Sequence, residues 1–174
     1  LETRLLVRQQ GEWTGYTYRW NDEQTDAALV PANGADQVFD VKDSAAPGGV
    51  RHQRWHFPSR AECMSCHSRA VNFVLGLTAP QMNKDHAYGD IRDNQLRTLE
   101  HLGVFSNAVA KAREKLTKLV DPHDATADLE ARARSYLHAN CSVCHVEAGG
   151  GNAQMELEFT RARDKMNLFS ARPP

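Results

Sequence analysis

The stretch RSYLHANCSVCHVEAGGG, from Arg134 to Gly151, contains two cysteines, two histidines and a run of three glycines. At its centre is a C-x-x-C-H motif. The motif also occurs upstream, and the two copies use every cysteine of the chain: Cys63, Cys66 and His67, then Cys141, Cys144 and His145. Because no cysteine is left over, the chemistry of this motif decides how the rest of the sequence is interpreted.

The motif is typical of c-type haem attachment. Its two thiols lie one helical turn apart and add to the two vinyl groups of haem, while the adjacent histidine binds the iron. We therefore expect two covalently attached haem c groups. The attachment residues would be Cys63, Cys66, Cys141 and Cys144, and the iron ligands on the attachment side would be His67 and His145.

Three other interpretations of the cysteines are weaker. A zinc site of four cysteines needs no histidine after either pair, and the 74 residues between the pairs exceed the usual spacing of roughly 15 to 20. A thioredoxin-like dithiol needs only one pair, set in a βαβ pattern that the sequence does not show. Structural disulfides would not explain why a histidine follows each pair.

Composition and charge exclude some classes of partner. The 174 residues have a net charge of -1, and the lysines and arginines are scattered, so we expect no nucleic-acid binding. No apolar run approaches the roughly 20 residues that span a bilayer, so we expect no membrane span. Because haem is attached outside the cytoplasmic membrane, we expect a periplasmic or extracellular location. The chain begins at Leu1 without a leader, and we interpret it as part of a longer precursor.

The N-terminal third shows the alternation of β-strands. Apolar and aromatic residues alternate from Thr3 to Trp20, and a second extended piece runs from Gln37 to Val41, before a turn at Pro47 to Gly49. We interpret the aromatic stripe, which includes Tyr16 and Tyr18, as core packing. The predicted domains are a β-rich segment at 1–57, a first haem module at 58–123, and a second at 124–174 that is incomplete at its C-terminus.

Helices are predicted around both motifs. Ser59 and Glu62 have capping-box spacing before the first motif. Further helices are expected to begin near Thr78 and to cover Asp90 to Leu102, with Leu96, Leu99 and Leu102 on one face and Gly103 as the stop, and then Asn107 to Leu119. After capping candidates Asp124 and Thr126, a last helix leads into the second motif with one apolar face: Leu129, Ala133, Tyr136, Leu137 and Cys141. The predicted fold class is mainly α, with cytochrome c-like haem modules and a small β-rich N-terminal segment.

Four stretches together resemble a group of bacterial dihaem c-type cytochromes that often occur beside, or fused to, quinoprotein (PQQ) sugar dehydrogenase domains. They are WTGYTYRWNDEQTDAALV, WHFPSRAECMSCH, NQLRTLEHLGVF and RARSYLHANCSVCH, and they cover most of the chain from Trp13 to His145. The resemblance implies electron transfer from a periplasmic dehydrogenase toward the respiratory chain, with redox proteins as partners. Members of this group continue past the point where this chain stops, with a Met-Pro-Pro type segment suited to bind the second iron.

The ligands on the far side of each iron are less constrained. For the first haem we favour Met82, which lies 15 residues past His67, over the rivals His52, His56, His86 and His101. For the second haem we assign none, since Met155, Met166 and His138 are each as compatible with ordinary packing. Arginines around the first motif would bind haem propionates, dock a partner or form a solvated surface: Arg51, Arg54, Arg60 and Arg69.

Three hypotheses about function follow. The first is an electron-transfer protein that is not an enzyme, in which each iron alternates between ferric and ferrous. The second is a dihaem peroxidase-like enzyme that keeps one iron open for peroxide and has a polar group placed for acid-base catalysis. The third is a structural or docking domain that merely retains haem.

Overall fold

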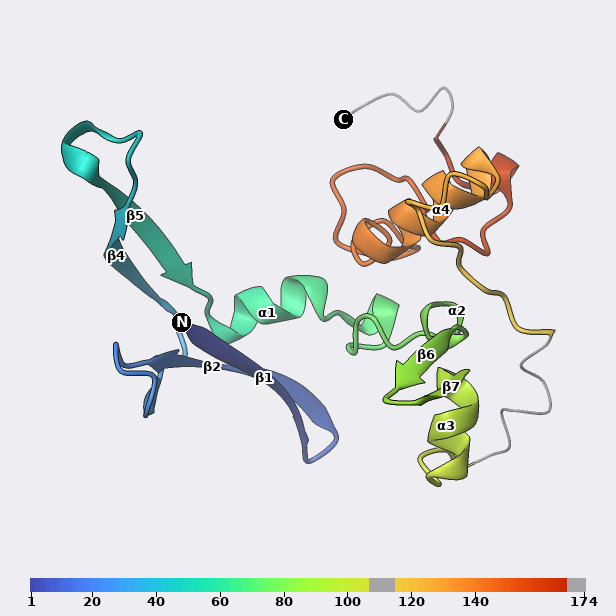
Figure 1. The fold of residues 1–174 in the computed structure, drawn as a ribbon, viewed down its shortest axis with the longest axis horizontal. Coiled ribbons are helices and arrows are strands. Elements are labelled where there is room, and N and C mark those ends of the chain that lie inside the picture. The colour runs from blue at the N-terminus through green and yellow to red at the C-terminus, as the bar shows by residue number, and fades with distance from the viewer. Residues whose placement is uncertain (107–114, 169–174) are drawn as a thin grey trace. The chain divides into compact units, whose positions relative to one another are not determined.

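The structure is a computed structural model that describes residues 1–106 and 115–168 (Figure 1). The chain divides into two compact units, Leu1–Ser68 and Arg69–Pro174. The first C-x-x-C-H motif therefore groups with the β-rich N-terminal segment, whereas the sequence led us to place it in a separate module at 58–123. The second motif belongs to the second unit.

The first unit begins with a three-stranded antiparallel sheet. Strands β1 (Glu2–Gln9) and β2 (Glu12–Trp20) form a hairpin, and β3 (Ala27–Leu29) pairs with the other edge of β2. Gln10 and Gly11 connect β1 to β2 with φ values of 51° and 89°. Positive φ at both central residues is the geometry that matches the twist of a tight hairpin.

A second antiparallel hairpin follows. It consists of β4 (Ala35–Lys42) and β5 (Val50–Phe57), which are joined by a loop that includes a short 3-10 turn at Pro47–Gly49. The extended segment predicted at Gln37 to Val41 and the turn after it are thus confirmed.

Helix α1 (Arg60–Cys66) completes the first unit and packs on β2. The predicted capping box is present: the Ser59 side chain accepts a hydrogen bond from the Glu62 backbone N–H, and the Glu62 carboxylate accepts one from the Ser59 N–H. This reciprocal pair satisfies two N–H groups that a helix start would otherwise leave without partners.

The second unit begins with a 3-10 turn at Arg69–Val71 and the short helix α2 (Ala79–Met82). A small hairpin of β6 (Asp85–Tyr88) and β7 (Ile91–Asn94) leads into α3 (Gln95–His101). The longest helix among the described residues, α4 (Leu129–Asn140), runs into the second motif, and a 3-10 turn at Arg163–Lys165 follows that motif.

The prediction of a mainly α fold is wrong. The structure is mixed, with 25% helix and 28% strand, and its described residues form three antiparallel sheets and four short helices. The N-terminal segments form four strands of eight or nine residues, namely β1, β2, β4 and β5. Helices α1 and α3 have only seven residues each. The β-rich part is therefore a larger share of the regular structure than the sequence led us to expect.

The helix predicted from Asp90 to Leu102 is only partly correct. Its first residues form β7, and α3 starts at Gln95 with the Asn94 side chain accepting from the backbone N–H groups of Leu96 and Arg97. The end at Gly103 is confirmed, because Gly103 has a φ of 69° and donates to the carbonyl of Glu100. Of the predicted helix at Asn107 to Leu119, residues 107–114 lie outside the described residues, and 115–119 are not α-helical.

Helix α4 forms as predicted, but the helix face that was predicted to be apolar and buried is not buried. Its N-cap is Asp128, whose side chain accepts from the Ala131 N–H, rather than Asp124 or Thr126. Leu129 and Tyr136 are 72% and 52% exposed. The most buried position is Ser135, whose hydroxyl accepts a hydrogen bond from the Val120 N–H.

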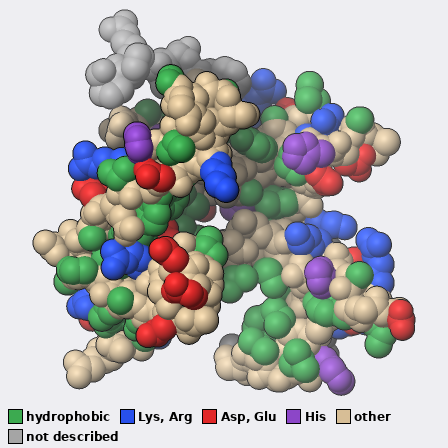
Figure 2. Space-filling model, turned by 60° about the vertical axis from the view of Figure 1, so that its left-hand side comes forward, with side chains coloured by type: hydrophobic (Ala, Val, Ile, Leu, Met, Phe, Trp, Pro, Cys, Tyr) green, Lys and Arg blue, Asp and Glu red, His purple; other side chains and the backbone are tan. Residues whose placement is uncertain are grey.

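The hydrophobic core of the described residues is small. Its buried members are Val30, Phe57, Leu96, Leu157 and Met166. The aromatic stripe on β2 is half-buried rather than part of this core, since Gly15 and Thr17 on the opposite face of the strand are the buried residues. Hydrophobic side chains are visible at the surface in Figure 2. Few apolar side chains of the described residues are therefore buried by the rest of the chain.

Candidate functional site

The second C-x-x-C-H motif continues the helical path of α4. Cys141 is the C-cap of the helix, and its N–H donates to the carbonyl of Leu137. The N–H groups of Cys144 and His145 both donate to the Cys141 carbonyl, with N to O distances of 3.1 and 2.9 Å. The motif thus forms one further turn, which brings the two cysteines together and holds His145 beside them. None of the four cysteines, all of which are described residues, is joined in a disulfide.

The imidazole of His145 is oriented by the loop that follows the motif. Its Nδ1 lies 3.3 Å from the backbone carbonyl oxygen of Ala153. A carbonyl oxygen only accepts hydrogen bonds, so Nδ1 carries the proton and the neutral ring has its lone pair on Nε2. This is the arrangement in which histidines usually bind metals, with the other ring nitrogen donating to a backbone carbonyl or carboxylate.

Two glycines let this loop pass close to the motif. A Cβ atom at Gly151 would lie 2.7 Å from His145 Nδ1 and 2.9 Å from the Cys144 carbonyl oxygen. A Cβ atom at Gly149 would lie 2.4 Å from the same carbonyl oxygen. The backbone N–H of Gly151 donates to that carbonyl at 2.9 Å. Gly149 therefore allows the backbone to pass close to the Cys144 carbonyl, and Gly151 allows it to pass close to the His145 ring.

The loop is fastened to α4 by Arg134. The guanidinium donates hydrogen bonds to the backbone carbonyls of Phe159, at 2.7 Å, and Arg161, and it lies 5.6 Å from the centre of the Phe159 ring. Further along, the Leu157 N–H donates to the His145 carbonyl at 2.8 Å. These contacts tie the residues after the motif to the helix before it.

The three residues considered as second ligands of the second iron have different surroundings. Met166 is buried with 2% exposure, and Met155 is half-buried. His138 accepts a hydrogen bond at Nδ1 from the Phe159 N–H at 3.2 Å, and burial lowers the pKa of its imidazole. No assignment among them follows from these contacts.

The first motif lies on α1. Cys63 and Cys66 are one turn apart in the helix, and His67 is its C-cap, with an N–H that donates to the Cys63 carbonyl at 3.0 Å. Cys63 and His67 are half-buried and Cys66 is exposed. Both motifs therefore present two thiols on one helical turn with the histidine at its end.

Strand β2 closely approaches the first motif. A Cβ atom at Gly15 would lie 2.7 Å from both Cβ and Sγ of Cys63. Two hydroxyl groups of this unit, on Thr17 of β2 and on Ser68 next to the motif, are buried without a hydrogen-bond partner. Such hydroxyl groups can serve a polar group that binds there.

A network of charges holds the start of α1 against the β4–β5 hairpin. His56 Nδ1 lies 2.9 Å from Asp36 Oδ1, and its Nε2 lies 3.1 Å from both oxygens of Glu62. Hydrogen bonds to Glu62 and Asp36 raise the pKa of His56. The Ser59 backbone N–H and then His56 lower the pKa of Glu62 to about 2. Both ring nitrogens face acceptors, so the protonated imidazole fits this position best.

Met82, the favoured second ligand of the first iron, is the last residue of α2 and is half-buried. Its four rivals are exposed. His52 contacts Asp40 at 2.6 Å, His56 bridges the two carboxylates above, His86 stacks edge-on against Tyr88, and His101 ends α3. The choice of Met82 stays a prediction.

Three of the four arginines predicted near the first motif have partners within their own unit. Arg54 donates to Asp36 at 2.9 Å, Arg51 lies 3.4 Å from Asp43, and the Arg60 guanidinium lies 4.7 Å from the centre of the Tyr16 ring. Arg69 belongs to the second unit and is exposed.

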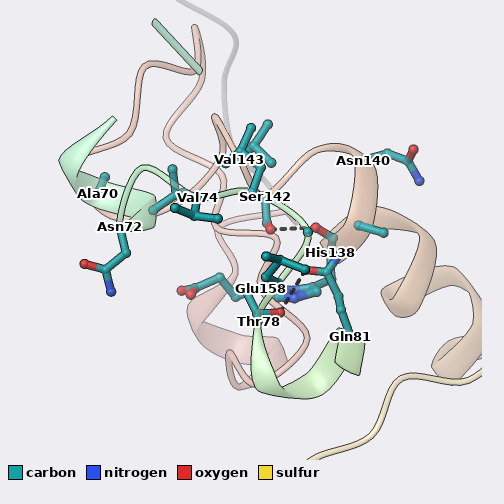
Figure 3. Close-up of a pocket in the computed structure, with 15 residues that line it drawn as sticks. Ala70, Asn72, Val74, Thr78, Gln81, His138, Asn140, Ser142, Val143 and Glu158 are labelled. Carbon is teal, nitrogen blue, oxygen red and sulfur yellow. Dashed lines mark hydrogen bonds between the residues drawn. The ribbon is translucent and has the colours of Figure 1, made fainter. Parts of the chain in front are cut away.

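A cavity of about 840 Å³ lies in the second unit beside the second motif (Figure 3). One wall is formed by residues between Ala70 and Gln81, and the other by the end of α4, Ser142, Val143 and Glu158. Within residues 1–106 and 115–168, no three His, Cys, Asp or Glu side chains are grouped so that they could hold a metal ion. No helix of the described part of the chain is long and apolar enough to cross a bilayer.

A scan against protein-family models matched none, and searches of curated proteins and of solved structures found no significant similarity. The functional evidence on this chain is therefore its two motifs and their local geometry.

The sequence identified both motifs but did not predict the contacts that position their residues. The contact of His145 with Ala153, the bridge formed by His56 and the close approach of Gly15 to Cys63 were not predicted. The glycine run after the second motif was the one available signal, because glycines next to a functional side chain often allow a close approach of the backbone. The other two contacts join segments distant in sequence.

Proposed function

We propose that this chain is a dihaem c-type cytochrome that passes electrons from a periplasmic dehydrogenase toward the respiratory chain. Cys63, Cys66 and His67 would hold one haem, and Cys141, Cys144 and His145 the other. When bound, haem would supply an iron that gains and loses one electron, while the chain sets its ligands and its exposure to water.

The observation that carries the proposal is the geometry of the second motif. Cys141 and Cys144 share one helical turn, and His145 donates Nδ1–H to Ala153, so that the Nε2 lone pair is left for iron. A structural disulfide or a dithiol would not require an oriented imidazole. The oriented ring favours haem attachment over a structural disulfide or a dithiol.

The surroundings of the motifs are compatible with a group that has a large apolar body and polar substituents, as haem has. Gly151 leaves space beside the His145 ring only for backbone, which bounds the ring on one side. The hydroxyl groups of Thr17 and Ser68 are buried without partners in the unit that contains the first motif. The small apolar core of the described residues is compatible with a cofactor that contributes its own hydrophobic surface.

The donor and the location belong to the same proposal. The resemblance to cytochromes that accompany quinoprotein sugar dehydrogenases suggests such a dehydrogenase as electron donor, with other redox proteins as partners. Covalent haem attachment places the mature protein in the periplasm or outside the cell.

The experiment is an absorption spectrum of full-length, matured protein in the oxidised and reduced forms, with carbon monoxide added to the reduced form. Two low-spin haems that do not react with carbon monoxide support electron transfer. One haem that binds carbon monoxide has an open iron position, and that result would favour the peroxidase-like alternative. Absence of any haem would overturn the proposal.

A further inference from the structure

The outer edge of β1 has no neighbouring strand among the described residues. The sheet of the first unit is ordered β1-β2-β3, so β2 covers one edge of β1 and the other edge is open (Figure 1). The Trp20 N–H donates to the Leu1 carbonyl at 3.1 Å, which fixes the phase of the antiparallel ladder. Every second residue of β1 therefore directs its backbone N–H and carbonyl to the open edge: Glu2, Arg4, Leu6 and Arg8. Backbone groups at an open edge form hydrogen bonds readily with an added strand.

The charges on β1 favour a second copy of the same strand as that neighbour. In an antiparallel pair with Leu5 opposite Leu5 of the second copy, Glu2 of each copy lies opposite Arg8 of the other. Opposite charges directly across from each other stabilise a strand pair, and like charges destabilise it. A shift by two residues would instead place Arg4 opposite Arg4 in one direction, or Arg4 opposite Arg8 in the other. The charges thus select one register.

Glu2 has an oxygen that can accept a further hydrogen bond. Its Oε1 accepts from Arg4 within the strand, while its Oε2 is buried without a hydrogen-bond partner among the described residues. By contrast, Asp36 on the β4–β5 hairpin is already bonded to Arg54 and His56. A guanidinium from a second copy of β1 would supply a charged donor to the Glu2 carboxylate.

An exposed apolar side chain at the centre of β1 supports the same register. Leu5 is 46% exposed and lies opposite Tyr16 on β2. It is on the face of the sheet opposite Gly15, the residue that closely approaches Cys63 of α1. In this register Leu5 meets its own copy at a position that is not hydrogen-bonded, where side chains approach most closely. Both leucines would lose contact with water, which favours association.

We propose that β1 pairs with β1 of a second copy of this chain in an antiparallel arrangement. The two three-stranded sheets then form one continuous sheet, with a two-fold axis between the two Leu5 residues. This interface is additional to haem attachment and does not depend on it. Because each copy contributes a single strand, the contact area is small, and the dimer exchanges with the monomer.

The test is sedimentation velocity of full-length, matured protein at concentrations from nanomolar to high micromolar. We expect a reversible equilibrium between monomer and dimer. Every contact occurs twice about a two-fold axis, so Glu2→Arg or Arg8→Glu converts two attractive pairs into two repulsive ones. Each variant should raise the dissociation constant of the dimer about tenfold or more.

A mixture of the two charge variants tests the register directly. In a mixed dimer, the arginines of Glu2→Arg face the carboxylates of Arg8→Glu at both ends of the strand pair. An equimolar mixture, with a fluorescent label on one variant, should therefore contain a mixed dimer at concentrations where each variant alone is monomeric. Circular dichroism of each variant shows that it is folded.

Leu5→Glu should also prevent dimer formation, because two carboxylates would meet at the two-fold axis. Leu29→Glu is the matched control, since Leu29 on β3 is 48% exposed and lies on the same face of the sheet as Leu5. Lys42→Glu, at an exposed position on β4, controls for a change of charge on the other hairpin. Both controls should form the dimer as the unaltered protein does.

Three results would overturn this proposal: a monomer at every concentration, a dimer that persists in Leu5→Glu, or two folded charge variants that form no mixed dimer. Loss of the dimer in Leu29→Glu or Lys42→Glu, with none in Leu5→Glu, would assign the interface to another strand and contradict the proposal as well. Sedimentation reports mass whether or not haem is attached. Failure of this proposal is thus distinguishable from failure of the proposed function.

Discussion

His145 Nδ1 lies 3.3 Å from the backbone carbonyl oxygen of Ala153. This contact joins the histidine of the second motif to a loop residue eight positions later, and it fixes which ring nitrogen carries the proton. Gly151, on the same loop, leaves no space for a side chain beside the ring. The loop after the motif therefore controls the orientation of the proposed iron ligand.

Replacing Gly151 by alanine should disturb that orientation. The new methyl group would lie 2.7 Å from Nδ1, so the ring must move and its bond to Ala153 weakens. Overpacking of this kind costs about 1–3 kcal/mol of stability. Because the bond to Ala153 makes the imidazole a stronger donor, its loss should raise the reduction potential of the second haem, measured by redox titration. Asn152→Ala, at an exposed position, is the control, and an unchanged potential in Gly151→Ala would contradict the assigned role.

Replacing Gly15 by alanine should affect the first motif only. The added Cβ would lie 2.7 Å from Cβ and Sγ of Cys63, so β2 and α1 must separate. We expect the first unit to lose about 1–3 kcal/mol of stability. Haem counting by the pyridine haemochrome method should give one haem per chain instead of two. Thr14→Val, on the other face of β2, serves as the control, and two haems in Gly15→Ala would show that the close contact is unimportant.

The bridge formed by His56 predicts a pH dependence for the first unit. The pKa of His56 is raised from its ordinary 6.5, so its contribution to stability is complete below about pH 6.5 and is lost as pH rises through the raised pKa. Glu62 contributes above its ordinary pKa of 4.5 and loses its contribution as pH falls toward about 2. The bridge should therefore stabilise most between these two ordinary values.

Urea unfolding followed by circular dichroism, at about pH 5.5 and about pH 8.5, checks this prediction. The unfolding midpoint of the unaltered protein should decrease at the higher pH by more than that of His56→Gln, which cannot be protonated. His52→Gln is a matched control, since His52 on β5 contacts the carboxylate of Asp40 on the neighbouring strand β4. Parallel pH profiles for the protein and His56→Gln would show that the bridge has no effect on stability.

Arg134 should be the main support of the loop after the second motif. Arg134→Met keeps much of the apolar stem but leaves the carbonyls of Phe159 and Arg161 without their donor. Loss of hydrogen bonds from a charged group predicts a decrease of about 1.5–3 kcal/mol in the free energy of unfolding, measured with urea. Arg163→Met, at an exposed side chain, should cost much less. Equal losses in the two variants would refute a special role for Arg134.

Local signals in the sequence predicted local structure well. The spacing of Ser59 and Glu62 predicted the capping box, and alternation predicted the first hairpin, because both depend on neighbours within a few residues. The small hairpin of β6 and β7 was missed, although Gly89 and Asp90 between two short runs are a turn signal. Its four-residue strands are too short for alternation to be distinguished from the start of a helix.

Contacts between segments that lie far apart in the sequence could not be predicted from it. The face of α4 that includes Leu129 and Tyr136 was predicted to be buried, but helical periodicity indicates only which residues share a face and not what covers it. Similarly, the sequence identified Cys63 and His145 by motif, whereas their contacts with Gly15 and Ala153 depend on the path of the backbone between them. The proposed haem-binding residues can thus be named from the motif alone, and they stay a prediction, whereas the contacts that position them could not be predicted from the sequence.

The central claim is that each motif holds one covalent haem, and the mass of the denatured, full-length protein matured in a cytochrome c-producing host tests it most directly. We predict a mass that exceeds that of the polypeptide by two haem groups, and by one haem group when Cys141 and Cys144 are both replaced by alanine. A polypeptide of unmodified mass in which the four cysteines bind zinc would contradict the account.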